Sequence, residues 1–248
     1  MTALLEVCCA NLQSVIAAAE AGAPRIELCS ALPVGGVTPS LGLLRAVRSR
    51  FPRLTIHVLV RPREGGFVYS PAEAALMEAD IRAAVSEGAD GIVCGALCPD
   101  GTIDVPLTAR LVAAAGGRPF TFHRAFDFVP SPAEALETLI DLGCTRVLTS
   151  GGAPTALDGA ETLRALIAQA AGRITVLPGG GINADNAASL LHLTGAAELH
   201  ASCSAPSADN AHATSLPPIP GLGAGYSCTS AKAVRSLLRA IGGTTPQA

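Results

Sequence analysis

Residues 132–152 read PAEALETLIDLGCTRVLTSGG, and this stretch contains the pattern that recurs along the whole chain. An Ala- and Leu-rich helical pattern over 132–142 ends at Gly143, and the apolar run 146–149 begins three residues later. Proline in the first turn of a helix and glycine just past its end are the usual signals of helix start and stop. The stretch therefore predicts a helix, a tight turn and a strand.

The same order of helix, glycine and strand recurs on both sides of this stretch. A helix-ending glycine precedes a new strand by two to four residues six times, at Gly22, Gly88, Gly116, Gly143, Gly172 and Gly195. The predicted strands are 4–8, 25–29, 55–60, 91–95, 120–123, 146–149, 174–178 and 197–201. The predicted helices are 12–20, 41–50, 71–87, 105–115, 132–142, 156–171, 184–193 and 231–240.

Alternating strands and helices demand parallel strands with right-handed crossovers. Eight such units in 248 residues match the size at which the sheet closes into a TIM-type (β/α)8 barrel. The alternative is an open doubly wound sheet, whose signature would be G-x-G-x-x-G after the first strand, but that turn reads CCAN. The glycine-rich turn PGGGIN (178–183) instead follows the seventh strand, where barrels commonly bind anions.

We therefore expect a single (β/α)8 barrel domain over residues 1–248, with a long loop at 204–230 after strand eight. That loop is rich in Ala, Pro, Gly and Ser. A loop of this length is typical either of a lid or interface element over an active face or of filler without a function.

Composition excludes several classes of protein. With 49% hydrophobic residues and a mean hydropathy of +0.43, the bulk of the chain is not disordered. A net charge of −3 without a basic run argues against nucleic-acid binding. The longest uncharged stretch, 210–231, is interrupted by prolines and glycines, so we expect no membrane segment. Eight cysteines without a recognisable leader predict a cytoplasmic protein with reduced thiols.

Polar residues gather at the ends of the predicted strands, which form the functional face of such a barrel. Because alternate strand residues share a face, Glu6 with Cys8 and Glu27 with Cys29 are candidate inward sets. His57 and Arg61 form a third. Charged groups inside a barrel are costly unless paired, so this cluster is either a functional site or a structural network of ion pairs.

Two kinds of chemistry fit these residues. Arginine guanidinium groups and free backbone N–H groups would bind a small anionic ligand, whether or not it carries a phosphate. Under this enzyme alternative the acid/base groups are Glu27, His123 and Asp127. The expected anion- or substrate-binding residues are Glu6, His57, Arg61, Arg124, Ser150, Gly179, Gly180 and His200.

Thiols offer the other chemistry. Cys8, Cys9 and Cys29 lie at the same end of two neighbouring strands, and soft thiolates select Cu(I) or Zn(II). The pair Cys94 and Cys98 belongs to no C-x2-C…C-x2-C array, which excludes a zinc-finger type of site. A single cysteine of this kind is more often buried apolar filler than a ligand.

Six segments of the chain resemble the copper homeostasis protein family CutC. They are LEVCC (5–9), RIELC (25–29), GGVTPS (35–40), IHVLVRPR (56–63), TFHRAFD (121–127) and RVLTSGG (146–152). The resemblance covers residues 1–204. It implies a cytosolic (β/α)8 barrel, often a homo-oligomer, that binds Cu(I), with Cys8 and Cys29 as the candidate metal ligands.

The resemblance has gaps. EGGF at 64–67 stands where the family has Gly-Gly-Asp-Phe, and the loop after His200 does not follow the family pattern. Five cysteines match no family cysteine: Cys94, Cys98, Cys144, Cys203 and Cys228. Three functions therefore stay open, namely Cu(I) binding in copper homeostasis, acid/base catalysis on a small anionic substrate, and a structural or partner-binding barrel.

Overall fold

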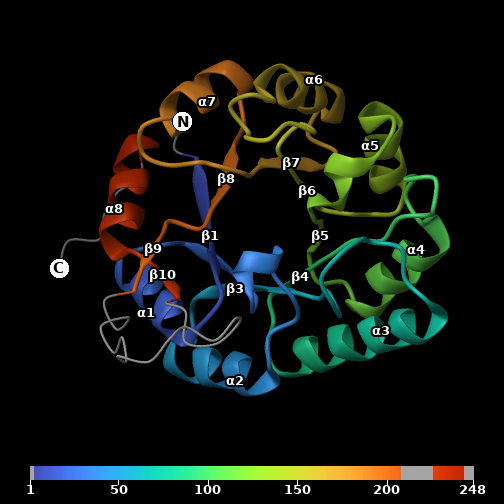
Figure 1. The fold of residues 1–248 in the computed structure, drawn as a ribbon, viewed down its shortest axis with the longest axis horizontal. Coiled ribbons are helices and arrows are strands. Elements are labelled where there is room, and N and C mark those ends of the chain that lie inside the picture. The colour runs from blue at the N-terminus through green and yellow to red at the C-terminus, as the bar shows by residue number, and fades with distance from the viewer. Residues whose placement is uncertain (1–2, 208–225, 243–248) are drawn as a thin grey trace, which may run out of the picture.

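The computed structural model describes residues 3–207 and 226–242 of the chain. In this part, eight parallel strands form one sheet in the order β7-β6-β5-β4-β3-β2-β1-β8. A parallel bridge between Gly179 and His200 joins the two outer strands, so the sheet closes into a ring with the helices outside it (Figure 1). This is a TIM-type (β/α)8 barrel, as the repeated strand and helix pattern predicts.

The observed elements follow the predicted order closely. The strands are β1 (Leu4–Cys9), β2 (Arg25–Leu28), β3 (Thr55–Leu59), β4 (Gly91–Cys94), β5 (Phe120–Phe122), β6 (Arg146–Thr149), β7 (Thr175–Pro178) and β8 (Glu198–Ala201). The helices are α1 (Leu12–Glu20), α2 (Leu41–Arg50), α3 (Pro71–Ser86), α4 (Val105–Ala114), α5 (Pro132–Asp141), α6 (Ala160–Ala170), α7 (Ala187–Thr194) and α8 (Ala231–Ala240).

Apolar side chains fill the space between the sheet and the ring of helices. Phe120 and Phe122 of β5 are buried there, with Leu136 from α5 and Leu163 from α6 in the same cluster. Sharp helix starts hold this layer in place, as at α3, where Ser70 and Glu73 form a reciprocal capping box. The apolar core therefore lies outside the barrel wall, which leaves much of the barrel interior to polar groups.

Two helices begin later than the sequence predicts. α6 begins at Ala160 rather than residue 156, because Thr155 and Asp158 form a hydrogen-bonded turn before it. α7 begins at Ala187 rather than 184, because the Asn186 side chain accepts a hydrogen bond from the backbone N–H of Asn183. Such side-chain bonds to nearby backbone compete with the helix.

The long loop expected at 204–230 after strand eight has ends that pair with each other. Its two ends, β9 (Ser204–Pro206) and β10 (Ser227–Thr229), pair as a short antiparallel ladder. The stretch between them, 208–225, lies outside the described residues. Two single 3-10 turns were also not predicted: η1 (Leu32–Val34) after β2 and η2 (Arg124–Phe128) after β5.

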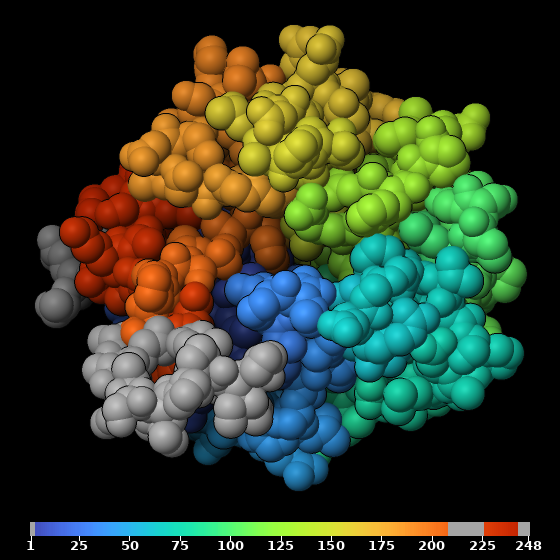
Figure 2. All heavy atoms as spheres, viewed as in Figure 1, coloured from blue at the N-terminus to red at the C-terminus, as the bar shows by residue number. Residues whose placement is uncertain are grey.

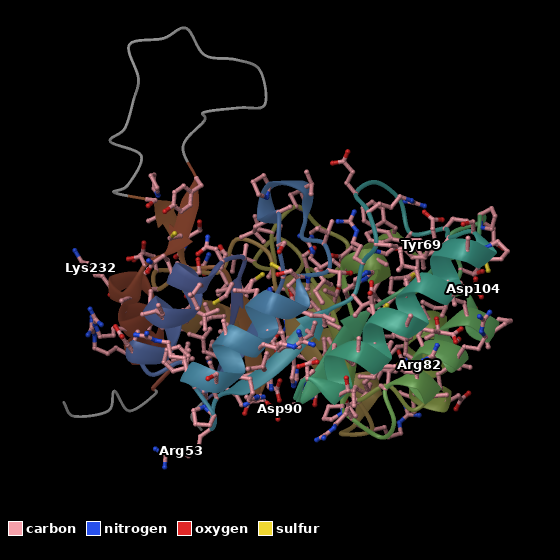
Figure 3. The ribbon with its side chains drawn as sticks, turned by 90° about the horizontal axis from the view of Figure 1, so that it is seen from below. Arg53, Tyr69, Arg82, Asp90, Asp104 and Lys232 are labelled. Carbon is pink, nitrogen blue, oxygen red and sulfur yellow. The ribbon has the colours of Figure 1, made fainter. Side chains whose placement is uncertain are left out.

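The two ends of the barrel carry different loops (Figure 3). Tyr69, which follows β3, lies toward one end, and Asp90, which precedes β4, lies toward the other. Loops that follow the strands thus gather at one end, where barrel enzymes place their functional residues. Among the described residues, no helix combines the length and apolarity that crossing a membrane requires.

Candidate functional site

A cavity of about 570 Å³ opens at the end of the barrel where the strands finish. The space-filling view down the barrel shows a hollow near the centre of this face (Figure 2). The volume falls within the range of small-molecule sites. We call it the mouth cavity, and its polar lining comprises Cys8, Glu27, Arg61, His123, Arg124, Asp127, Ser202 and His200, with the glycines Gly35, Gly152, Gly180 and Gly181.

Three potential metal ligands meet at the cavity wall formed by β1, β2 and β8. Donor atoms of Cys8, Glu27 and His200 all lie within 4.8 Å of one another. The Cys8 thiol donates to Glu27 Oε1 at 3.5 Å, whereas Glu27 Oε2 has no hydrogen-bond partner among the described residues. Burial raises the pKa of Glu27 and outweighs the opposing charge of His200. Thiol, carboxyl and imidazole therefore converge on one point.

Cys29 lies behind Cys8. Its sulfur is 3.6 Å from the Cys8 sulfur, yet Cys29 is fully buried and does not line the cavity. The hydrogen bond to Cys29, burial and the nearby Glu27 carboxylate raise the pKa of the Cys8 thiol well above its ordinary value. The two thiols predicted as a pair are thus adjacent, but only Cys8 faces the cavity.

Glu6 lies beneath this cluster and is fully buried. Its Oε1 is 2.9 Å from His200 Nδ1, and its Oε2 is 3.2 Å from His57 Nδ1 and 2.5 Å from Arg25 Nε. Burial alone would raise the pKa of Glu6, but hydrogen bonds from His200 and His57 and the charge of Arg25 hold it well below the ordinary value. Glu6 is therefore an anchor for His200 and His57 and does not reach the cavity.

An ion-pair network continues from Glu6 toward the opposite end of the barrel. Arg25 bridges Glu6 and Glu198, and Arg146 Nε lies 2.9 Å from the Glu198 carboxylate. Arg25 is only 3% exposed. Arg25 and Arg146 were not predicted as part of this cluster, although Arg25 stands two residues before Glu27 and so shares its inward face. This part of the polar interior is the structural network considered above.

Arg61 is not the free anion clamp that the sequence suggests. Its Nη1 donates to the carbonyls of Val34 and Gly36 and its Nη2 to that of Gly65, which leaves Nε unpaired among the described residues. The guanidinium also lies over the Phe67 ring, 5.2 Å from its centroid. Arg61 therefore holds the loops after β2 and β3 together, because nearby backbone carbonyls take its donors.

Arg124 keeps free donors. Its Nε pairs with Asp127 Oδ2 at 2.7 Å and its Nη2 donates to Ser150 Oγ at 2.9 Å, while Nη1 has no partner among the described residues. The Asp127 carboxylate also accepts from the Thr149 hydroxyl and from the backbone of Ser150 and Gly152. Asp127 and Ser150 thus position Arg124 and the turn after β6.

His123 is a neutral hydrogen-bond donor at the cavity wall. Burial, together with the nearby positive charge of Arg61, lowers its pKa to about 3. Its Nδ1 accepts the backbone N–H of Ala125 at 3.3 Å, so in the neutral ring the proton is on Nε2. That Nε2 has no partner among the described residues.

The predicted site residues therefore separate into two groups. Cys8, Glu27, Arg61, His123, Arg124, Asp127, Gly180 and His200 line the mouth cavity. Five others, Glu6, Cys29, His57, Ser150 and Gly179, lie behind it as supports. Sequence reasoning missed Phe67, whose ring lies 5.0 Å from that of His123 in the cavity wall.

Comparison with known proteins agrees with this architecture. The model of the CutC family matches residues 3–205, which contain all of the residues above. The chain belongs to the CutC family. A CutC family protein from Xylella fastidiosa is 48% identical over 244 residues, covering 97% of this chain and 90% of that protein.

The chain is also similar to CutC proteins from other organisms. The human copper homeostasis protein cutC homolog is 47% identical over 226 residues, covering 91% of this chain and 82% of the human protein. The solved structure of a CutC protein from Streptococcus agalactiae is 33% identical, with a TM-score of 0.77, and the match covers 81% of this chain and 98% of that one. The CutC barrel thus extends over nearly the whole of that structure.

Proposed function

We propose that this CutC chain serves copper homeostasis by binding Cu(I) as its cargo at Cys8, with Cys29 and His200 as the further ligands. The proposal rests on one observation: the sulfurs of Cys8 and Cys29 lie 3.6 Å apart beside His200 in the wall of the mouth cavity. The names of the human and mouse relatives, copper homeostasis protein cutC homolog, support it.

The donor atoms suit a soft ion. Thiolates select Cu(I) among the first-row metals, and imidazole also binds copper. The sulfur separation is close to the roughly 3.8 Å edge of a tetrahedral thiolate site with metal–sulfur bonds of about 2.3 Å. Cys8 faces the cavity, so an entering copper ion would meet its thiol first. The buried Cys29 thiol beside it would be the second sulfur ligand.

Glu6 prepares His200 for this role. The contact from His200 Nδ1 to Glu6 leaves Nε2 as the nitrogen available to a metal. A carboxylate behind a ligating imidazole is the usual support in metal sites, because it fixes the ring and its tautomer. Glu27 is hydrogen-bonded to the Cys8 thiol and can accept the proton that metal binding displaces.

The proposal extends to the cellular location and the oligomeric state of the protein. All eight cysteines are free thiols, and reduced thiols are typical of the cytoplasm. We place the protein there, as a single barrel domain that forms a homo-oligomer. Sedimentation of the reduced protein would measure the oligomeric state.

Titration with Cu(I) against a chromophoric chelator tests the binding proposal. We expect the reduced protein to bind one equivalent tightly, and the double variant Cys8→Ser/Cys29→Ser to lose that equivalent. Cys98→Ser/Cys228→Ser is the matched control, because it removes two partly exposed thiols outside the mouth cavity. Tight binding that survives in the first variant and disappears in the second would overturn the proposal.

A further inference from the structure

The cavity wall formed by the loops after β5, β6 and β7 contains several hydrogen-bond donors. In the ring of strands, β5 and β6 lie across the barrel from β1 and β2, and β7 lies between β6 and β8. Their following loops bring Arg124, Gly180 and Gly181 to the mouth cavity, where Ile182 also lines it. The two thiols proposed above as metal ligands come from β1 and from the end of β2, whereas His200 on β8 is bridged to Gly179 next to this turn.

In the turn after β7, some backbone N–H groups have no partner in the described part of the chain. Gly180 and Gly181 have φ values of +113° and +71°, a conformation that side chains rarely adopt. Neither Gly181 nor Ile182 donates its N–H to another described residue. Consecutive N–H groups in a glycine turn form a concave anion site.

Arg124 faces the same turn. A Cβ atom added at Gly180 would lie 3.6 Å from Arg124 Nη1, the guanidinium nitrogen without a partner. The glycine therefore leaves room between the turn and the guanidinium. Five donors hold the Asp127 carboxylate behind Arg124, from Arg124, Thr149, Ser150 and Gly152. That carboxylate fixes the guanidinium in place, with Nη1 still open.

We propose that this wall binds the phosphate group of a small phosphorylated molecule, held by Arg124 Nη1 and the N–H groups of Gly181 and Ile182. His123 contributes a further donor, Nε2–H, to the same cavity. Guanidinium and backbone N–H groups together match the several oxygens of a phosphate. The 570 Å³ cavity leaves room for the rest of a small ligand.

This inference is independent of the copper proposal, because it uses none of the thiols. Inorganic phosphate is the probe, with acetate as the carboxylate comparison and chloride to hold the ionic strength constant. In amide NMR spectra of the full chain, we expect saturable shifts of the Gly181 and Ile182 signals with phosphate. Shifts confined to other residues, shifts that do not saturate, or equal shifts with acetate would overturn the proposal.

Variants give the second test. Arg124→Gln is expected to weaken phosphate binding at least tenfold, and Arg124→Lys should recover part of it. Arg63→Gln is the matched control, because Arg63 is 40% exposed, close to the 45% of Arg124, and pairs with Glu73 outside the cavity. Binding equally weakened by Arg63→Gln would overturn the site. Cys8→Ser/Cys29→Ser should leave phosphate binding unchanged, so failure of the copper proposal is seen separately.

Discussion

Glu6 Oε1 lies 2.9 Å from His200 Nδ1, joining a fully buried carboxylate to a histidine in the wall of the mouth cavity. The two residues are paired in register on β1 and β8, which are the first and last strands of the barrel. Burial alone would lower the pKa of His200, but the carboxylates of Glu27 and Glu6 raise it above the ordinary value. Glu6 thus orients His200, which lines the cavity, although Glu6 itself does not line it.

Replacing Glu6 by Gln should weaken Cu(I) binding by about 10–100-fold, the usual effect of losing an outer carboxylate behind a metal ligand. Chelator competition measures it. Glu198→Gln is the control, because Glu198 pairs with Arg25 and Arg146 in the same network, whereas His200 pairs with Glu6. Equal losses in both variants would show that the network acts through stability alone.

Arg25→Met should lower the free energy of unfolding by about 3–5 kcal/mol, because it removes the cation shared by the buried Glu6 and the partly buried Glu198. Urea unfolding followed by circular dichroism checks this value. Arg45→Met removes a surface pair with Glu87, and such pairs contribute little. A small effect of Arg25→Met would mean that Glu6 and Glu198 find other partners.

Gly159→Ala should destabilise the protein more than Gly195→Ala. Gly195 needs a positive φ of 73° but has open space around it, so alanine there costs about 1–2 kcal/mol. Gly159 has an ordinary φ, yet a Cβ atom would collide with the carbonyl of Ser150. Thermal unfolding of the two variants gives the order, and the reverse order would contradict the close packing of this turn.

His123 should make the protein less stable as the pH falls. The unfolded chain protonates this histidine near 6.5, while in the folded protein its pKa is about 3. Between these values the unfolded state binds the extra proton, so the free energy of unfolding decreases as the pH is lowered through this interval.

The comparison with His123→Gln isolates this contribution. Between pH 7 and pH 5, the wild type should lose about 2 kcal/mol more stability than the variant. Urea unfolding at the two pH values measures both. Parallel losses would show that His123 titrates normally in the folded protein.

Local sequence signals were enough to predict the barrel. Helix-ending glycines such as Gly143 and Gly195 adopt positive φ values in the structure, and they separate helix from strand without reference to the rest of the fold. The starts of α6 and α7 were wrong because Asp158 and Asn186 form local turns. Asp and Asn occur both in such turns and at the starts of helices, so composition cannot decide between a turn and the first turn of a helix.

The site was harder to predict. Strand alternation correctly places Glu6, Cys8 and Glu27 inside the barrel, because period two is a property of the strand alone. It could not show that loop carbonyls take the donors of Arg61, since those carbonyls come from Val34, Gly36 and Gly65. Pairings between distant segments depend on loop paths, which the local pattern does not encode.

The central claim is that Cys8, Cys29 and His200 together hold Cu(I). X-ray absorption at the copper edge of the Cu(I)-loaded, reduced protein tests it most directly. We expect two sulfur ligands and one imidazole nitrogen, with the nitrogen lost in His200→Phe and the sulfurs lost in Cys8→Ser/Cys29→Ser. A copper environment that is unchanged in both variants would contradict the claim.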